Sequence, residues 1–273
     1  MRTTPLAEAY AWDDFERVVV LSPHLDDAAL SCGGLLEFLR DREAAGLVIT
    51  VCSGNPPATL RQGEGAPGRP RRGHATPRVR RKEDIAAMHA VDADFVHLSF
   101  PDSIYRRSPL TGRFIYRDAR EPWVAPRMED LPHIEELYLV LRRLCLNLGR
   151  ILLVSPLGIG RHVDHTIVAQ AALRLAERGL ALLFYEDFPY VVDPGLTGIP
   201  DDPAQAFARL GLAPGQRHVL PVDVGAKASL IRRYTTQLPA LFEGEADLEA
   251  QLGARTHRGW PCEYYWRAAG TAG

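Results

Sequence analysis

The chain has 273 residues, and its content of 46% hydrophobic and 24% charged residues excludes an intrinsically disordered protein. A net charge of −2 argues against nucleic acid as a partner. No apolar run approaches the about 20 residues of a membrane span, and the first one, residues 18–21, is too short for a secretory signal. The four cysteines are scattered without a CxxC pair, which indicates a reducing, cytoplasmic compartment rather than a disulfide framework.

Short runs of β-branched residues or leucine alternate with helical patterns along the chain. In chain order, the patterns predict a strand at 17–21, a helix at 27–43, a strand at 47–52, a helix at 81–90, a strand at 95–99, a helix at 134–148, a strand at 151–155, a helix at 165–178, strands at 181–185 and 218–222, and a helix at 227–238. Such alternation is typical of a mostly parallel sheet. We therefore predict a single α/β domain over residues 1–273, a Rossmann-like doubly wound sheet with helices on both faces.

Two long segments interrupt this pattern. The first is a basic, Gly/Pro-rich loop at about residues 55–80; between Arg61 and Lys82 there are eight basic residues and one acid, Glu64, which gives a local charge of +7. This loop is either a passive solvated insertion or a lid over an anionic or carrier-bound substrate. The second segment, residues 100–128, has little periodicity and several aromatic side chains. We expect it to form a pocket wall.

Two clusters of histidine and aspartate follow the first and fourth predicted strands, in the runs SPHLDDAALSCGG and SPLGIGRHVDHTIV. They contain six residues able to bind a metal or transfer a proton: His24, Asp26, Asp27, His162, Asp164 and His165. Either cluster alone would be explained by capping of the following helix. However, loops at the carboxyl ends of parallel strands converge on one crevice. The two clusters together therefore predict one site.

Three of the six residues form a set of metal ligands. His24, Asp27 and His165 supply two imidazoles and one carboxylate. Three protein ligands with an open fourth position are typical of catalytic Zn²⁺, whereas structural zinc sites have four protein ligands. We therefore predict a zinc cofactor at this site.

The other three residues have no metal to bind in this scheme. Asp26 lies next to a ligand and is predicted to take a proton from the attacking water. Protonated His162 is predicted to donate to the oxyanion that forms on the substrate. Asp164 lies between the two histidines of the second motif, and we expect it to hold one imidazole in its tautomer.

The sequence PHLDDAALSCGG followed by HVDH resembles the PIG-L/LmbE-like zinc-dependent N-deacetylases, which remove acetyl groups from N-acetylglucosamine-type sugars. The segments RRKEDIAAMHAVDADFVHLSFPD, YEDFPY and EYYWR are similar to further parts of this family. The resemblance implies an N-acetylated amino sugar or glycoside as the small-molecule substrate. It also implies the same zinc ligands, with Asp26 as general base and His162 as oxyanion partner.

Two positions depart from the family pattern. Ala28 stands where the first motif often ends in a glutamate, and Gly160 stands where some members have a tyrosine. Any assistance from a tyrosine is therefore expected from Tyr185 or Tyr190. Neither departure removes a predicted metal ligand.

Four further residues are candidates for substrate binding: Arg80, Asp102, Glu186 and Asp187. Arg80 and Glu83 form an Arg-x-x-Glu pair that resembles a substrate-contact position of the family, although a surface helix pair is the alternative. The other three follow predicted strands, where turn formation or helix capping is the alternative. Trp260 and Trp266 are predicted to pack in the core rather than to stack on a sugar.

The favoured function is hydrolysis of an N-acetyl or other N-acyl group on an amino sugar or glycosylated metabolite. A non-haem iron enzyme is one alternative, because it shares the ligand types, although such enzymes favour antiparallel double-stranded β folds and do not need Asp26. A carbohydrate- or carrier-binding protein on a hydrolase scaffold is the other. Loss of a ligand or of Asp26 would favour it, and neither is lost. The sequence is compatible with a homo-oligomer.

Overall fold

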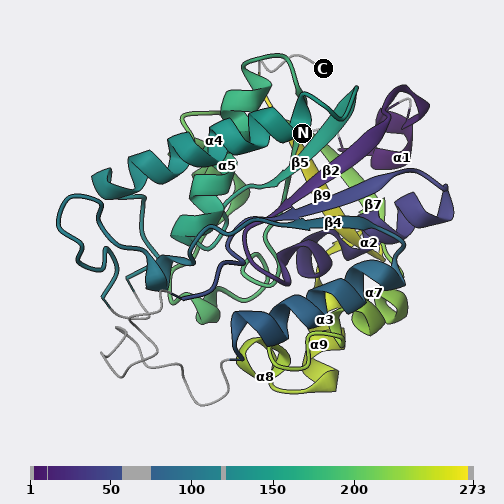
Figure 1. The fold of residues 1–273 in the computed structure, drawn as a ribbon. Coiled ribbons are helices and arrows are strands. Elements are labelled where there is room, and N and C mark those ends of the chain that lie inside the picture. Colours follow the sequence, from purple (N-terminus) through teal and green to yellow (C-terminus); the bar gives the residue numbers. More distant parts are fainter. Residues whose placement is uncertain (1–2, 11, 57–74, 118–120, 270–273) are drawn as a thin grey trace.

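The computed structural model describes residues 3–10, 12–56, 75–117 and 121–269 (Figure 1). The strands are β1 Thr3–Pro5, β2 Arg17–Ser22, β3 Gly46–Thr50, β4 Asp94–His97, β5 Ile151–Pro156, β6 Ala181–Tyr185, β7 Pro214–Pro221, β8 Thr256–His257 and β9 Trp260–Ala268. The α-helices are α1 Leu6–Ala9, α2 Asp27–Asp41, α3 Pro77–Ala90, α4 Leu131–Cys145, α5 Val163–Ala176, α6 Pro203–Arg209, α7 Val224–Ile231, α8 Leu238–Leu241 and α9 Glu245–Ala254. In the part of the chain so described, every helix is too short or too polar to cross a bilayer.

A nine-stranded sheet in the order β1-β7-β9-β6-β5-β2-β3-β4, with β8 paired to β9, forms the centre of the described fold. β2 lies parallel to both β3 and β5, and the parallel pairing continues through β3 to β4 and through β5 to β6. The chain therefore leaves β2 in one direction along the sheet and returns on its other side. The point where the strand order reverses, between β2 and β5, is where ligands bind in sheets of this kind. The predicted mostly parallel α/β fold is confirmed.

Alternate residues of the central strands face two separate cores. Val19 and Leu21 pack in the core that contains α4 and α5, whereas Val18 and Val20 pack in the core that contains α2 and α7. Figure 1 shows these helix layers on opposite sides of the sheet. Each fully buried valine or leucine contributes about 1.5–3 kcal/mol, so both faces of β2 hold the strand in place.

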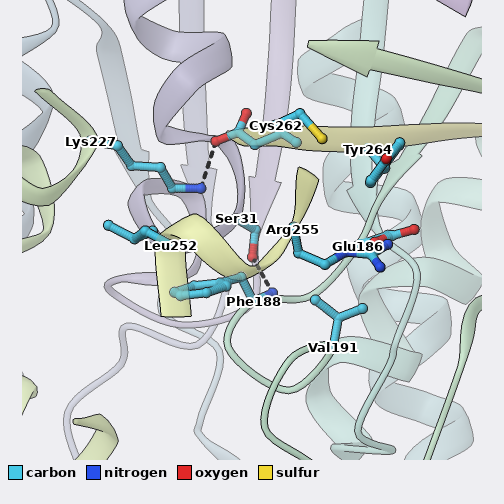
Figure 2. Close-up of a pocket in the computed structure, with 10 residues that line it drawn as sticks. Ser31, Glu186, Phe188, Val191, Lys227, Leu252, Arg255, Cys262 and Tyr264 are labelled. Carbon is cyan, nitrogen blue, oxygen red and sulfur yellow. Dashed lines mark hydrogen bonds and ion pairs between the residues drawn. The ribbon is translucent and has the colours of Figure 1, made fainter. Parts of the chain in front are cut away.

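The strand β9 was not predicted from the sequence. It lies antiparallel to both β6 and β7, and it is buried on both faces except near its ends. Glu263 interrupts its apolar run, which hides the strand pattern in the sequence. In the fold, the Glu263 carboxylate accepts hydrogen bonds from the backbone amides of Gly34 (2.8 Å) and Leu35 (3.1 Å), just after a kink in α2. Buried Lys227 lies 2.7 Å from the same carboxylate (Figure 2). Glu263 thus joins β9 to α7 through Lys227, and through the two amides it joins β9 to α2, the helix that begins at the first aspartate cluster.

Three other sequence expectations change in the fold. Most of the predicted basic loop, residues 57–74, lies outside the described residues, and the end of the basic stretch is helical because α3 begins at Pro77. Helices α6 and α9 lie in a region where the sequence pattern predicted none. Trp266 is buried as predicted, but the prediction for Trp260 was wrong. It is 72% exposed, because it starts β9 in the short hairpin with β8.

Candidate active site

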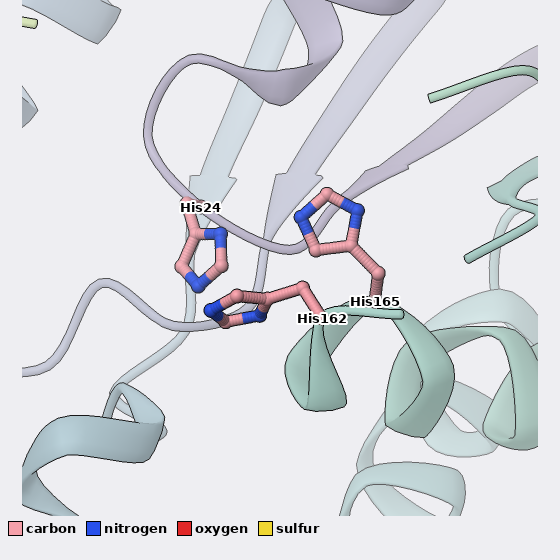
Figure 3. Close-up of side chains that lie close together, drawn as sticks. All are labelled: His24, His162 and His165. Atoms are coloured by element: carbon pink, nitrogen blue, oxygen red, sulfur yellow. The ribbon is translucent and has the colours of Figure 1, made fainter. Parts of the chain in front are cut away.

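The two predicted clusters meet at the carboxyl ends of β2 and β5. His24 follows β2, His162 is the N-cap of α5, and His165 lies in the first turn of that helix. Figure 3 shows the three imidazoles converging from these two segments. The ring centre of His24 lies 4.8 Å from that of His162 and 5.4 Å from that of His165. Residues about 140 positions apart in the sequence thus form one site, as the strand topology predicts.

Asp27 faces two of these imidazoles with one oxygen. Its Oδ2 atom lies 3.2 Å from His24 Nδ1 and 3.3 Å from His165 Nε2. His165 Nε2 is buried and lacks a hydrogen-bond partner among the described residues. A buried nitrogen that faces a carboxylate without a hydrogen bond fits a cation between the two. The three donor atoms match the ligand types of a catalytic metal site.

The second nitrogen of each imidazole has a carboxylate partner. His24 Nε2 lies 3.1 Å from Asp164 Oδ2, and His165 Nδ1 lies 2.7 Å from Asp187 Oδ1. Such partners keep the proton on the outer nitrogen and leave the inner nitrogen, toward Asp27, free to ligate. Asp164 thus holds an imidazole, which is the contact expected of it.

The electrostatics of the site favour positive charge. Burial opposes the charged form of His24, but its contacts with Asp164 and Asp27 raise its pKa well above the usual value. Burial likewise opposes charge on His165, whereas Asp27 and Asp187 raise its pKa to about 9. The histidines hold Asp27 ionised, with its pKa well below the usual range despite burial. A divalent cation would supply the same positive charge, so the residues fit a metal.

Asp187→Asn is expected to lower metal affinity about 10- to 100-fold, because an amide no longer fixes the proton on His165 Nδ1. Titration of the apoprotein with metal against a competing chelator measures this. Glu186→Gln is the matched control, since the adjacent Glu186 contacts Arg255 and Trp266. Equal losses of affinity in the two variants would contradict a specific role for Asp187.

His162 differs from the other two histidines. Its Nδ1 accepts a hydrogen bond from the backbone amide of Asp164 at 3.3 Å, so its Nε2 carries the proton of the neutral ring. Burial and the neighbouring His24 lower the pKa of His162 well below its usual value. The ring is therefore neutral in this structure, in contrast to the protonated His162 expected from the sequence, because it is buried beside other imidazoles. A neutral ring can still donate from Nε2.

Two groups of ligand-type atoms lie within 4.8 Å of one another: the three histidines, and His24 with Cys52 and Asp164. In the second group Asp164 is already engaged. Its oxygens lie 2.6 Å from Arg106 Nη1 and 3.0 Å from the backbone nitrogen of Ser103. The positive charge of Arg106 also disfavours a cation there. The set of His24, Asp27 and His165 therefore fits a metal better than this second group does.

Asp26 lies beside the ligands with a different environment. It is the N-cap of α2, yet its side chain makes no capping bond to the described backbone. Instead Oδ2 lies 3.2 Å from Arg80 Nη2. Burial raises the pKa of Asp26 to about 6, although Arg80 opposes the shift. A carboxylate with a pKa near neutrality is suited to gain and lose a proton during a reaction.

A cavity of about 790 Å³ opens above these side chains. The prediction of a pocket wall in residues 100–128 is confirmed, because Asp102, Tyr105 and Trp123 line the cavity. Tyr190 also lines it, and its ring centre lies 5.2 Å from that of Trp123. Tyr185 is buried, and its hydroxyl donates to the carbonyl of Leu21. Of the two tyrosines considered from the sequence, only Tyr190 can meet a substrate here.

A family described as PIG-L, GlcNAc-PI de-N-acetylase, matches residues 19–176, which is more than half of the chain. The chain belongs to the PIG-L family. Membership makes it a hydrolase of the N-deacetylase type, as the sequence predicted. The fold and the family leave no basis for the alternatives of a non-haem iron enzyme or a binding protein.

Two 2'-N-acetylparomamine deacetylases are relatives of this PIG-L protein. The one from Niallia circulans is 33% identical over 258 residues, which are 88% of this chain and 87% of that protein. The one from Streptomyces fradiae is 30% identical over 179 residues, which are 64% of this chain and 57% of that protein.

Solved structures with the same fold include two of a deacetylase of teicoplanin biosynthesis. Its complex described as deacetylase-bog has a TM-score of 0.71 and 28% identity, and the comparison covers 94% of this chain and all of that chain. The form described as zinc-inhibited has the same TM-score and coverage, with 27% identity. These similarities extend the PIG-L assignment across nearly the whole fold.

Two of the four predicted substrate-binding residues do not line the active-site cavity of this PIG-L protein. Glu186 lines a separate cavity of about 30 Å³, where it pairs with Arg255 (Figure 2). It also accepts a hydrogen bond from Trp266. Asp187 is fully buried behind His165. Both therefore act inside the fold rather than on a substrate. Arg80 and Asp102 do line the active-site cavity.

Two residues at the site, Arg106 and Cys52, were not predicted from the sequence. Arg106 is buried and pairs with Asp164 and Asp130. The carboxylates raise the pKa of its guanidinium further although burial opposes this, so it stays charged. Cys52 lines the cavity next to His24. Neither residue lies in a motif. For Cys52 the sequence holds one signal, because the residue ends the predicted strand at 47–52. For Arg106 it holds none.

Proposed function

We propose that this protein is a zinc-dependent N-deacetylase that removes the acetyl group from an amino sugar carried on a glycoside or glycosylated metabolite. The observation that carries the proposal is the pair of carboxylate-held imidazoles facing Asp27, with Asp26 beside them and paired with Arg80. The names of relatives that act on 2'-N-acetylparomamine and on teicoplanin support such a substrate. The cavity of about 790 Å³ lies in the upper part of the range of about 300–1,000 Å³ that is usual for small-molecule sites.

The metal would be held by His24 Nδ1, Asp27 Oδ2 and His165 Nε2. Two imidazoles and one carboxylate suit zinc, and one related structure is described as a zinc-inhibited form. When bound, zinc would polarise the acetyl carbonyl and lower the pKa of the attacking water to about 7.

Asp26 accepts the proton of the attacking water and returns it to the departing amine. Arg80, 3.2 Å from Asp26, keeps that carboxylate oriented toward the cavity. His162 donates from Nε2 to the carbonyl oxygen as it becomes negative, and because the ring is neutral it needs no proton from solvent. Asp102 uses Oδ1 to accept from the amide of Ile104, which leaves Oδ2 to accept from a sugar hydroxyl.

We further propose that residues 1–273 act as one domain, since a single sheet joins β1 near the start of the described chain to β9 near its end. The four cysteines are all free and scattered, which supports a cytoplasmic location as a proposal.

The test is a screen of N-acetylated amino glycosides, with N-acetylglucosamine methyl glycoside, 2'-N-acetylparomamine and teicoplanin that carries an N-acetylated amino sugar as probes. Released primary amine and acetate are measured on the purified protein, before and after chelation and after return of Zn²⁺. Equal release of amine and acetate, lost with the chelator and restored by zinc, is the expected result. Acetate release that survives complete removal of the metal would contradict the mechanism.

The pH dependence follows from Asp26. The active form is the carboxylate, and its pKa is raised to about 6, so kcat/KM is expected to rise with pH through that region. Arg80→Gln removes the positive charge that opposes the shift, so the midpoint should move to higher pH. Profiles of kcat/KM for both proteins measure this. An unmoved midpoint would show that another group controls the profile.

A further inference from the structure

The turn at residues 157–162 carries His162 and leads into the helix that bears His165. Gly158 and Gly160 have φ values of +82° and +87°, and Arg161 adopts φ +65°, which is unfavourable for a residue with a side chain. Such a conformation persists only when its surroundings hold it. The groups that hold this turn therefore help to set the position of His162.

Asp187 holds the first part of the turn. Its Oδ2 accepts hydrogen bonds from the backbone amides of Gly158 and Ile159, both at 2.8 Å. Because its other oxygen contacts His165, removal of Asp187 disturbs the turn and a predicted metal ligand together.

Asp201 and Arg209 hold the second part. Asp201 Oδ2 accepts from the backbone amide of Gly160 at 2.9 Å, and its side chain is 1% exposed. Arg209 pairs with both oxygens of Asp201, at 2.7 and 2.5 Å, and donates to the carbonyl of Gly158 at 2.8 Å. The ion pair is thus hydrogen-bonded to the Gly160 amide and the Gly158 carbonyl of the turn. None of the contacts found for it in the described chain involves His24, Asp27 or His165.

The turn also packs directly on the cavity wall. A Cβ atom added to Gly160 would lie 2.8 Å from Cβ of Tyr190, so the Gly160 backbone and Tyr190 are in close contact. Tyr190 lines the cavity, and Trp123 packs against both Tyr190 and His162. A shift of Gly160 is therefore expected to move His162, the proposed oxyanion donor, and the aromatic side chains of Tyr190 and Trp123 at the cavity wall.

We propose that Asp201, together with Arg209, is a positioning residue for His162 in the deacetylation reaction. The inference rests on the proposed function, in which His162 Nε2 donates to the carbonyl oxygen. Asp201 acts by fixing Gly160, two residues before His162. The predicted metal ligands His24 and His165 are held by other carboxylates, those of Asp164 and Asp187. Its loss should therefore lower kcat with little change in metal content or KM.

The test compares Asp201→Asn with Asp202→Asn. Asp202 is the adjacent carboxylate, but it caps α6 by accepting from the amide of Gln205 at 2.8 Å. Asp201→Asn is expected to lower kcat by up to about 100-fold, the cost of a misplacement of about 1 Å, with one metal ion still bound. Asp202→Asn should keep kcat. Equal losses in both variants would reduce Asp201 to a structural role.

A double-mutant cycle with His162→Ala separates positioning from general destabilisation. If Asp201 acts through His162, Asp201→Asn should have little further effect once the imidazole is gone. An undiminished effect in that background would overturn the proposal.

The ring ¹H–¹⁵N signals of His162 give a readout that does not depend on activity. Asp201→Asn should shift them, whereas Asp202→Asn should not, and unshifted signals in Asp201→Asn would also overturn the proposal. A wild-type protein that deacetylates no probe would contradict the proposed function instead, and the ring signals would still decide whether Asp201 positions His162.

Discussion

Asp26→Asn is expected to lower kcat by about 100- to 10,000-fold while the metal content stays unchanged. The amide has nearly the same shape and can still contact Arg80, but it cannot accept the proton of the attacking water. Asp26 contacts Arg80 rather than the predicted ligand imidazoles, so the metal site should survive. Steady-state kinetics on the best N-acetyl substrate and elemental analysis of the same preparation measure both quantities.

Asp102→Asn is the matched control for this prediction. Asp102 lines the same cavity, and its Oδ2 lies 3.9 Å from His24 Nε2. It is proposed to bind a hydroxyl, so its loss should act mainly on KM. A kcat in Asp26→Asn close to that of the wild type, or a loss of metal in that variant, would remove Asp26 from the role of general base.

The parallel part of the fold could be predicted because its strands are continuous apolar runs. Val18, Val19, Val20 and Leu21 are all buried, two on each face of the sheet, so β2 needs no alternation to be recognised. The position of the site followed from the same source. Once β2 and β5 are parallel neighbours, the motifs behind them must share one edge of the sheet.

What could not be predicted depends on partners that are distant in the sequence. Glu263 looks like an interruption until Gly34, Leu35 and Lys227 surround its carboxylate. Asp187 and Glu186 follow the same strand, yet one turns toward His165 and the other toward Arg255. Neighbouring carboxylates at a strand end point in different directions, and only the packed fold decides which reaches the site.

The protonation state of His162 also depends on contacts that the sequence does not reveal. The prediction from the sequence is a protonated ring. In the fold the side chain of Asp164 pairs with Arg106 and His24 and lies 4.0 Å from His162 Nδ1, whereas its backbone amide donates to that nitrogen at 3.3 Å. The direction of that hydrogen bond makes the ring a neutral donor.

His165→Ala is expected to abolish both metal binding and activity. Two remaining ligands hold zinc poorly, and Asp187 loses the imidazole that neutralises it. His162→Ala is the control, because the His162 ring lies 4.8 Å from that of His24 and 5.4 Å from that of His165. It should keep the metal and lose about 100- to 1,000-fold in kcat, the usual effect of removing an oxyanion donor.

Metal content after dialysis, measured beside circular dichroism to verify folding, distinguishes the two variants. If His162→Ala also lost the metal, His162 would belong to the ligand set, and its imidazole could not serve as the donor to the oxyanion. Full occupancy in a folded His165→Ala would instead remove His165 from that set. We expect His165→Ala to lose the metal and His162→Ala to keep it. His165 Nε2 is buried without a hydrogen-bond partner among the described residues, whereas His162 Nδ1 already accepts a hydrogen bond from a backbone amide.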